Sequence, residues 1–269
     1  KKQQEYLNQK WRNSCINDTY EPGSVFKIVT ATAGLEQGKV KVSDHFNCPG
    51  FRIVEDRRIR CHKTTGHGSE TFREGIMNSC NPVFMEVGAR VGVDGMYDMF
   101  RKLGLFEKTG IDLPGEANSI MHKKKNVKAV ELATMSFGQS IQITPLQLLR
   151  AASAAVNGGK LITPHFGVRT VSADGKKEKI FEYPEKKGVI QKETSETLRD
   201  LLKAVVSEGS GRNCKIEGFS IGGKTATSEK LPRGNGKYIS SFLGFSKAED
   251  PTVMGIVLID EPEGTYYGG

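Results

Sequence analysis

A polar turn leads directly into a helical pattern in the stretch Asp18-Thr19-Tyr20-Glu21-Pro22-Gly23-Ser24-Val25-Phe26-Lys27. Apolar residues continue at three- and four-residue steps, which predicts a helix from Ser24 to a stop near Gly38. Residues three apart share a helix face, so Lys27 is expected beside Ser24. A serine becomes a nucleophile when a base takes its proton, and lysine serves as that base when burial or a second cation lowers its pKa. Alone, however, the pattern equally fits a helix-capping serine followed by an unrelated lysine.

Two further motifs follow along the chain. Ser79-Cys80-Asn81 offers a hydroxyl suited to relay a proton, and an amide that both donates and accepts hydrogen bonds. Gly222-Gly223-Lys224-Thr225-Ala226-Thr227 follows a predicted strand, whose edge can bind an extended peptide. Lys224 and Thr225 would then hold a substrate carboxylate. Each motif alone is weak evidence, because the alternatives are a polar turn and a glycine-rich strand entry. In the order S-x-x-K, S-x-N, K-T-x the three motifs together are strong evidence for one functional site.

The order of the predicted elements indicates a mixed fold. Helical periodicity dominates the middle of the chain and residues 193–207, whereas the last third is rich in strands. Residues 238–246 and 252–259 are predicted as paired strands. This order favours an α/β fold of the α+β type over a parallel βαβ fold. Further expectations are strands and turns over 39–68, a capping box at 71–74, a break at 78–82, a helix over 83–104, an interrupted helical region over 131–157, and strands near 160–170 and 178–183.

Composition limits the class of protein. The 269 residues carry a formal net charge of +8, but the charge is scattered and no basic stripe with interleaved aromatics appears. Nucleic acid is therefore not expected as a partner. No run of about 18 apolar residues is present, so no membrane span is predicted within the chain.

Five potential zinc ligands gather between residues 48 and 80. Cys48, Cys61, His67 and Cys80 are the preferred set, with His62 as the alternative to His67. Zinc takes four such ligands in a closed tetrahedral site. The spacings do not match a C-x₂-C finger, so a Cys48–Cys61 disulfide and three reduced packing cysteines stay open as alternatives.

The three motifs together resemble those of the transpeptidase domain of class B penicillin-binding proteins. Further similar segments are Gly66-His67-Gly68, Phe137-Gly138-Gln139-Ser140-Ile141 and the run 144–148. The resemblance covers nearly the whole chain and is greatest to the sporulation-type members, which make spore cortex. It implies the fold shared with serine β-lactamases, in which helices flank an antiparallel sheet beside a helical subdomain. It also implies one transpeptidase domain over residues 1–269. Membrane-anchor and dimerisation regions and a C-terminal helix of the family would lie outside this chain.

The resemblance also implies roles for individual residues. Ser24 attacks a stem peptide at its D-Ala-D-Ala bond, Lys27 accepts the proton, and Ser79 passes it to the departing D-Ala. The residues expected to bind the peptide are Asn81, Lys224, Thr225 and Thr227, and the amides of Ser24 and Thr227 would form the oxyanion hole. β-Lactams would trap Ser24. The chemistry requires no cofactor, although a structural zinc ion would brace the S-x-N loop.

The resemblance places the full protein at the outer face of the cell membrane, with a membrane glycosyltransferase as partner. One departure is Ala226, where the family usually has glycine, and its methyl group is expected to alter β-lactam reactivity. Two other functions are weighed against the transpeptidase. One is a serine β-lactamase or β-lactam sensor, for which no second base is apparent. The other is a non-catalytic scaffold of wall synthesis.

Overall fold

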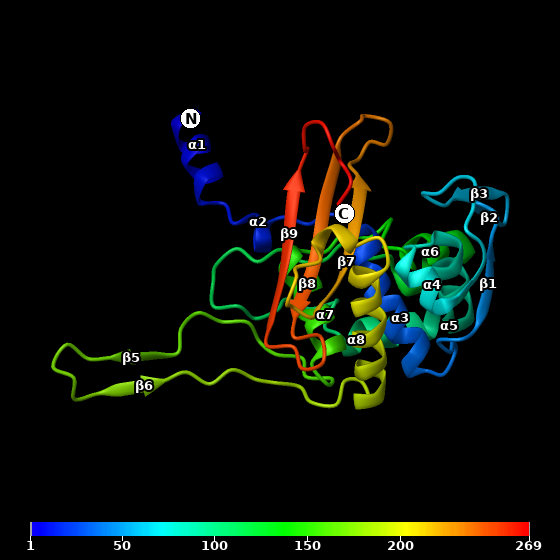
Figure 1. The fold of residues 1–269 in the computed structure, drawn as a ribbon. Helices are drawn as coiled ribbons and strands as arrows, with labels where there is room; N and C mark the ends of the chain where they lie inside the picture. Colours follow the sequence, from blue (N-terminus) through cyan, green and yellow to red (C-terminus); the bar gives the residue numbers. More distant parts are fainter. Residues whose placement is uncertain (1, 269) are drawn as a thin grey trace.

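A three-stranded antiparallel sheet forms the centre of the computed structural model, which describes residues 2–268 (Figure 1). Its strands are β7 (Ile221–Glu229), β8 (Tyr238–Ser246) and β9 (Val253–Asp260), in that order. The register pairs Thr225 with Phe242 and Thr227 with Ser240. Among the described strands β7 pairs with β8 alone, so its other edge has no strand partner. The paired strands predicted from the sequence are confirmed, apart from shifts of one residue at the ends.

Helices pack against β7 and fill the core. The amphipathic α8 (Lys192–Ser207) lies along β7, as does the short 3-10 helix η1 (Gly23–Phe26). η1 continues into α3 (Lys27–Glu36), which is buried over nearly its whole length and packs against α5 (Asn81–Lys102). The predicted helix from Ser24 is therefore confirmed, with a 3-10 first turn.

A helical part completes the molecule beside the sheet. It includes α4 (Phe72–Met77), α6 (Ala129–Met135) and α7 (Pro145–Val156), with a 3-10 turn η2 (Lys124–Asn126). The capping box predicted at Thr71 is confirmed, because Thr71 and Glu74 exchange side-chain and backbone hydrogen bonds. The α/β fold class, with helices flanking an antiparallel sheet, is confirmed.

Small hairpins and two further helices lie outside these layers. β1 (His45–Cys48) pairs with β4 (Gly68–Thr71), and β2 (Phe51–Val54) pairs with β3 (Arg57–Arg60). β5 (Arg169–Val171) and β6 (Glu178–Ile180) form a hairpin that projects from the body at the lower left of the view, and α1 (Lys2–Trp11) lies apart at the upper left (Figure 1). α2 (Ser14–Asn17) follows α1, and the 3-10 turn η3 (Arg212–Cys214) follows α8.

Three boundary predictions were wrong in detail. The helix expected over 83–104 begins at Asn81, because Pro82 is favoured in a first turn, where its missing N–H costs nothing. For the same reason Pro145 opens α7 and does not interrupt a helix. The strand expected near 160–170 is limited to β5, and its earlier residues make one isolated bridge, from Leu161 to Lys186.

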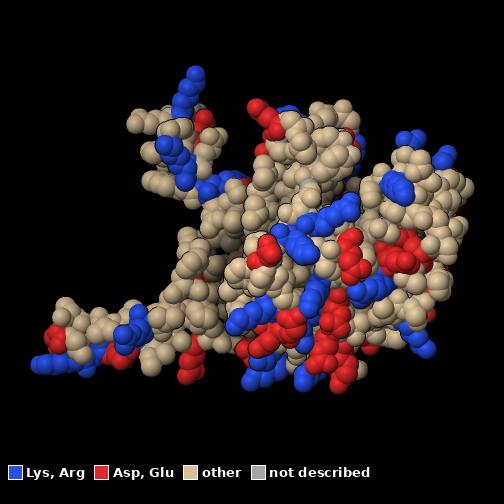
Figure 2. Space-filling view, in the orientation of Figure 1, with Lys and Arg blue, Asp and Glu red and all other residues tan. Residues whose placement is uncertain are grey.

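Charge is mixed on the surface. On the face shown in Figure 2, Lys and Arg side chains are interspersed with Asp and Glu over the lower part of the body. Within residues 2–268, no helix combines the length and the apolar character needed to cross a membrane.

Candidate active site and an adjoining cysteine–histidine cluster

Ser24 lies in η1, at the entrance to α3, and is half-buried. Two glycines shape its turn. Gly23 has φ of 53°, and a Cβ there would lie 2.2 Å from Ser228 Oγ. Gly138 has φ of 82°, and a Cβ there would lie 2.1 Å from the carbonyl oxygen of Gly23. Gly23 N donates to Gly138 O at 2.9 Å. The segment around Gly138 is thus fitted backbone to backbone against the turn that presents Ser24.

Lys27 begins α3 one turn after Ser24 and is fully buried. Its Nζ donates to Ser79 O at 2.6 Å, to Ser79 Oγ at 3.2 Å and to Asn81 Oδ1 at 2.7 Å. Burial lowers the pKa of Lys27 to about 8, against the opposing influence of Cys61, Cys80 and Glu70. A substantial fraction of this amine is therefore neutral near physiological pH, as a proton acceptor must be.

Ser79 and Asn81 come from the junction of α4 and α5. Ser79 has φ of 53°, which is uncommon for a residue other than glycine and is often found at functional sites. The Asn81 amide is held at both ends: Oδ1 accepts from Lys27, and Nδ2 donates to Arg60 O at 3.1 Å. Asn81 is thereby oriented by the strand β3 as well as by Lys27.

β7 contributes the opposite wall. Thr225, Ala226 and Thr227 line a cleft of about 330 Å³ together with Ser24, Ser79 and Asn81. The structure therefore brings together six of the residues singled out in the sequence. Ala226 is almost fully buried there, so its methyl group occupies part of this wall.

Lys224 lies behind this wall. It is fully buried, and its Nζ donates to Thr225 O at 3.1 Å. Burial and then the charge of Lys27 lower its pKa well below the usual value. Lys224 is thus separated from the open cleft by Thr225, which lines it.

Several residues of the cleft were missed in the sequence. His62, Gln139, Arg212 and Tyr267 line it, from four segments far apart in the chain. His62, the alternative zinc ligand, therefore faces the catalytic cleft. Only the motif around Gln139 carried a signal for this position, because a single loop residue has no periodicity to mark it.

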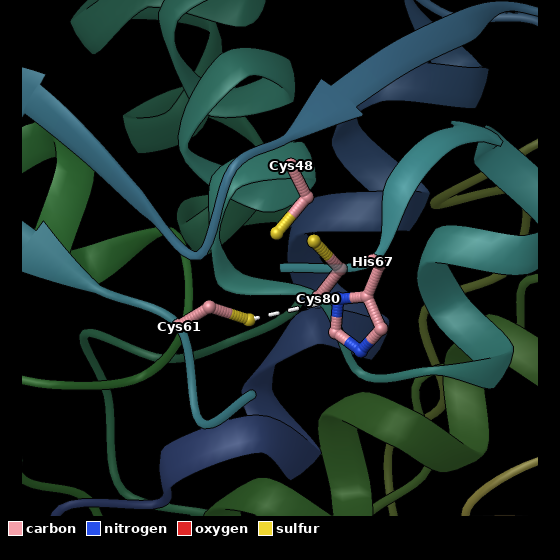
Figure 3. A group of neighbouring side chains, drawn as sticks. All are labelled: Cys48, Cys61, His67 and Cys80. Carbon is pink, nitrogen blue, oxygen red and sulfur yellow. Dashed lines mark hydrogen bonds between the residues drawn. The ribbon is translucent and has the colours of Figure 1, made fainter. Parts of the chain in front are cut away.

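Four potential metal ligands meet beside the cleft. The ligand atoms of Cys48, Cys61, His67 and Cys80 all lie within 4.8 Å of one another, and their side chains point toward a common centre (Figure 3). The three cysteines are buried, and all five cysteines of the chain are free thiols, so no Cys48–Cys61 disulfide is present. The cluster contains the preferred four residues of the sequence prediction.

The β-hairpin backbones bring the cluster together. Cys61 N donates to Gly50 O at 2.8 Å, and a Cβ on Gly66 would lie 2.3 Å from Cys48 O. These close approaches place Cys48 against the loop that carries Cys61 and His67. A hydrogen bond between Cys80 and Cys61 lowers the pKa of the Cys61 thiol and raises that of Cys80. Cys61 therefore has the thiolate character that a metal ligand needs.

Glu70 adds a buried acidic group to this cluster. It is 3% exposed, its Oε1 has no hydrogen-bond partner among the described residues, and that atom lies 3.8 Å from His67 Nδ1. A buried carboxylate beside three thiols is unfavourable without a compensating cation. The donor set fits a zinc ion, which would add positive charge beside Glu70.

A serine at a helix entrance, a buried lysine bonded to a second serine, and a strand that lines the same cleft are the arrangement of a serine acyltransferase. The family described as "Penicillin binding protein transpeptidase domain" matches residues 1–269, and the chain belongs to this family.

Two curated relatives illustrate the relationship. The chain is 44% identical over 264 residues to Stage V sporulation protein D of Bacillus subtilis, covering 96% of this chain and 41% of that protein. It is 30% identical over 271 residues to the probable peptidoglycan D,D-transpeptidase PenA of Neisseria meningitidis, covering 97% of this chain and 44% of that protein. The chain thus spans about two fifths of the length of these relatives.

Solved structures show the same fold. Penicillin-binding protein 3 of Mycobacterium tuberculosis, complexed with aztreonam, superposes with a TM-score of 0.87 at 29% identity, over 95% of this chain and 60% of that one. The D,D-transpeptidase domain of a peptidoglycan glycosyltransferase from Eggerthella lenta superposes with a TM-score of 0.88 at 26% identity, over 97% and 66%.

Proposed function

We propose that this domain is a peptidoglycan D,D-transpeptidase that cross-links stem peptides through an acyl-enzyme on Ser24. The observation that carries the proposal is the hydrogen bonding of Lys27 to Ser79 and Asn81 in the cleft that also holds Ser24. Relatives named as peptidoglycan D,D-transpeptidases support it.

In the acylation step, Ser24 Oγ attacks the carbonyl carbon of the penultimate D-Ala. Neutral Lys27 takes the hydroxyl proton, and the backbone amides of Ser24 and Thr227 stabilise the oxyanion. The peptide C–N bond then breaks as the proton passes through Ser79 to the departing amine. Free D-Ala leaves, and an ester joins the donor stem to Ser24.

In the transfer step, an amine of a second stem attacks this ester. A new amide bond forms, the bond to Ser24 Oγ breaks, and the proton lost by the amine returns to Ser24 by way of Lys27. During both steps Asn81 binds the donor amide. The carboxylate is held at Thr225, with Lys224 behind this residue and donating to its backbone carbonyl.

β-Lactams are the expected inhibitors, because their strained amide presents the same carbonyl to Ser24. The solved relative from Mycobacterium tuberculosis is complexed with aztreonam in one structure and with ampicillin in another. In this chain the Ala226 methyl group narrows the cleft on its β7 side. Bulky β-lactams should therefore acylate Ser24 more slowly than they would if glycine stood at position 226.

The biological setting follows from the relative at 44% identity, which is named for sporulation. We infer a role in spore cortex or septal wall synthesis. The substrate lies outside the cytoplasmic membrane, so we place the full protein at the outer face of that membrane, with a membrane glycosyltransferase as partner.

We also propose a structural zinc ion at Cys48, Cys61, His67 and Cys80. Zinc would supply no step of the reaction. It would neutralise the buried thiolates and fix the loop that carries Ser79 and Asn81. Elemental analysis of purified protein tests this: about one equivalent of zinc is expected. Its absence from folded, active protein would contradict the proposal.

Transpeptidation itself is tested by measuring whether the acyl-enzyme passes its acyl group to an added amine acceptor. The domain is incubated with an acyl-D-Ala-D-Ala peptide and a D-amino acid acceptor, and the exchanged peptide is measured by mass spectrometry. Acceptor-dependent product in wild type but not in Ser24→Ala supports a transferase. Loss of a β-lactam adduct within seconds would instead favour the β-lactamase alternative, and absence of any adduct would favour the scaffold.

A further inference from the structure

The cleft has one end at Thr225. Thr225 Oγ1 donates to Ser210 Oγ at 3.5 Å, and Arg212 follows two residues later, in η3. The other end lies at Thr227, whose Oγ1 accepts from Gly268 N at 3.0 Å. The contact with Ser210, two residues before Arg212, places the chain that carries Arg212 beside Thr225. In the proposed function this is the end that holds the carboxylate of the departing residue.

Charge in the cleft is distributed unevenly. Lys27 and Lys224 are fully buried, and neither lines the open cleft. Among the described residues that line it, Arg212 is the cation with an exposed side chain, and no Asp or Glu is found there. A ligand carboxylate that enters from solvent therefore meets Arg212 before it senses either lysine.

The Arg212 side chain makes no ion pair or hydrogen bond with any of residues 2–268. Its backbone, in contrast, is fixed: Arg212 N donates to Gly209 O, and Lys215 N donates to Arg212 O. A guanidinium with five free donors on a fixed backbone is well suited to a carboxylate, which it binds through two parallel hydrogen bonds.

We propose that Arg212 is a substrate-binding residue that contacts the carboxylate on the leaving-group side of the scissile bond. This inference rests on the proposed transferase function and adds the residue that selects for acidic leaving groups. The same contact would serve a D-amino acid used as acceptor, because it would occupy the position that D-Ala has vacated and carry its carboxylate next to the attacking amine.

The test compares two thioester substrates that differ by one charge. Both carry the same acyl-D-Ala group; one has thioglycolic acid as its leaving group and the other the neutral thioglycolamide. The ratio of kcat/KM for acid over amide is measured by loss of thioester absorbance in wild type, Arg212→Gln and Arg212→Lys. Lys215→Gln is the matched control, because it removes an exposed charge three residues away that does not line the cleft.

We expect the acid-over-amide ratio to fall about tenfold in Arg212→Gln, with the rate on the amide unchanged, as for loss of one charge-assisted hydrogen bond. Arg212→Lys should retain part of the preference, and Lys215→Gln all of it. An unchanged ratio in Arg212→Gln, or an equal loss on both substrates, would overturn the role of Arg212. Failure of wild type to cleave either thioester would instead overturn the transferase function.

Discussion

The Nζ atom of Lys27 lies 2.7 Å from Oδ1 of Asn81, and this hydrogen bond joins the first turn of α3 to the first turn of α5. It links two sequence motifs that are more than fifty residues apart. The Asn81 side chain also donates, through Nδ2, to the carbonyl oxygen of Arg60. Arg60 immediately precedes Cys61 of the cysteine–histidine cluster. Lys27 and the segment that carries Cys61 are therefore connected through the side chain of Asn81.

The first prediction concerns pH. Lys27 must be neutral to accept the Ser24 proton, and its pKa is lowered to about 8. The acylation rate should therefore rise as pH increases, by about tenfold per unit below that value, and level off above it. Stopped-flow measurements with a chromogenic β-lactam between about pH 6 and pH 10 check this. A rate independent of pH over that range would exclude Lys27 as the base.

The second prediction concerns Asn81→Asp. A carboxylate at this position would favour the ammonium form of Lys27 and raise its pKa. Acylation at neutral pH should slow about tenfold for each unit of that rise, and it should recover as the pH is raised. Asn47→Asp, the same change on the exposed face of β1, is the control and should leave the rate unaltered. Loss of activity that no increase in pH restores would contradict this account.

The third prediction concerns the cluster. Cys80→Ser removes one of four zinc ligands, so zinc content and thermal stability should both fall, with a decrease in Tm of about 5 °C or more. Cys15→Ser alters an exposed cysteine away from the cluster and should change neither. Zinc analysis and calorimetry on the three proteins provide the measurement. Wild-type melting in Cys80→Ser, with or without a chelator, would rule out a structural metal.

The fourth prediction concerns Ala226→Gly. Removing the methyl group should widen the cleft on its β7 side. Acylation of Ser24 by bulky β-lactams should therefore speed up more than acylation by small ones. Glycine within a strand should also lower the free energy of unfolding by about 0.5–1 kcal/mol. Acylation rates for a matched pair of large and small β-lactams, with a urea melt, check both effects. Equal acceleration of the two β-lactams would show that the methyl group does not limit access.

Much of the fold was predictable from the sequence, and so was the gathering of Ser24, Ser79 and Asn81 in one cleft. Helical periodicity after Ser24 predicted the local helix, and the order of the three polar motifs indicated which residues share a site. The motif from Gly222 to Thr227, expected to follow a strand, lies within β7. Strand ends near 160–170 were misjudged because that segment has few cross-strand partners to stabilise it. The sequence predicts interruptions at Pro82 and Pro145, whereas both residues stand where helices begin.

The remaining cleft residues were not predictable in the same way. Arg212 and His62 reach the cleft from turns whose position depends on packing distant in sequence. The burial of Lys224 behind Thr225 depends likewise on how β7 packs against α8. No periodicity in a single sequence encodes these relationships, so they emerge only from the folded chain.

The central claim is that Ser24 is the acylated nucleophile, and covalent labelling tests it most directly. The folded domain is incubated with a fluorescent penicillin, the adduct is measured by intact mass, and the modified residue is located by peptide mapping. The account predicts one adduct per chain on the peptide that contains Ser24, and none in folded Ser24→Ala. An adduct that persists in Ser24→Ala, or a folded wild-type domain that forms no adduct, would contradict it.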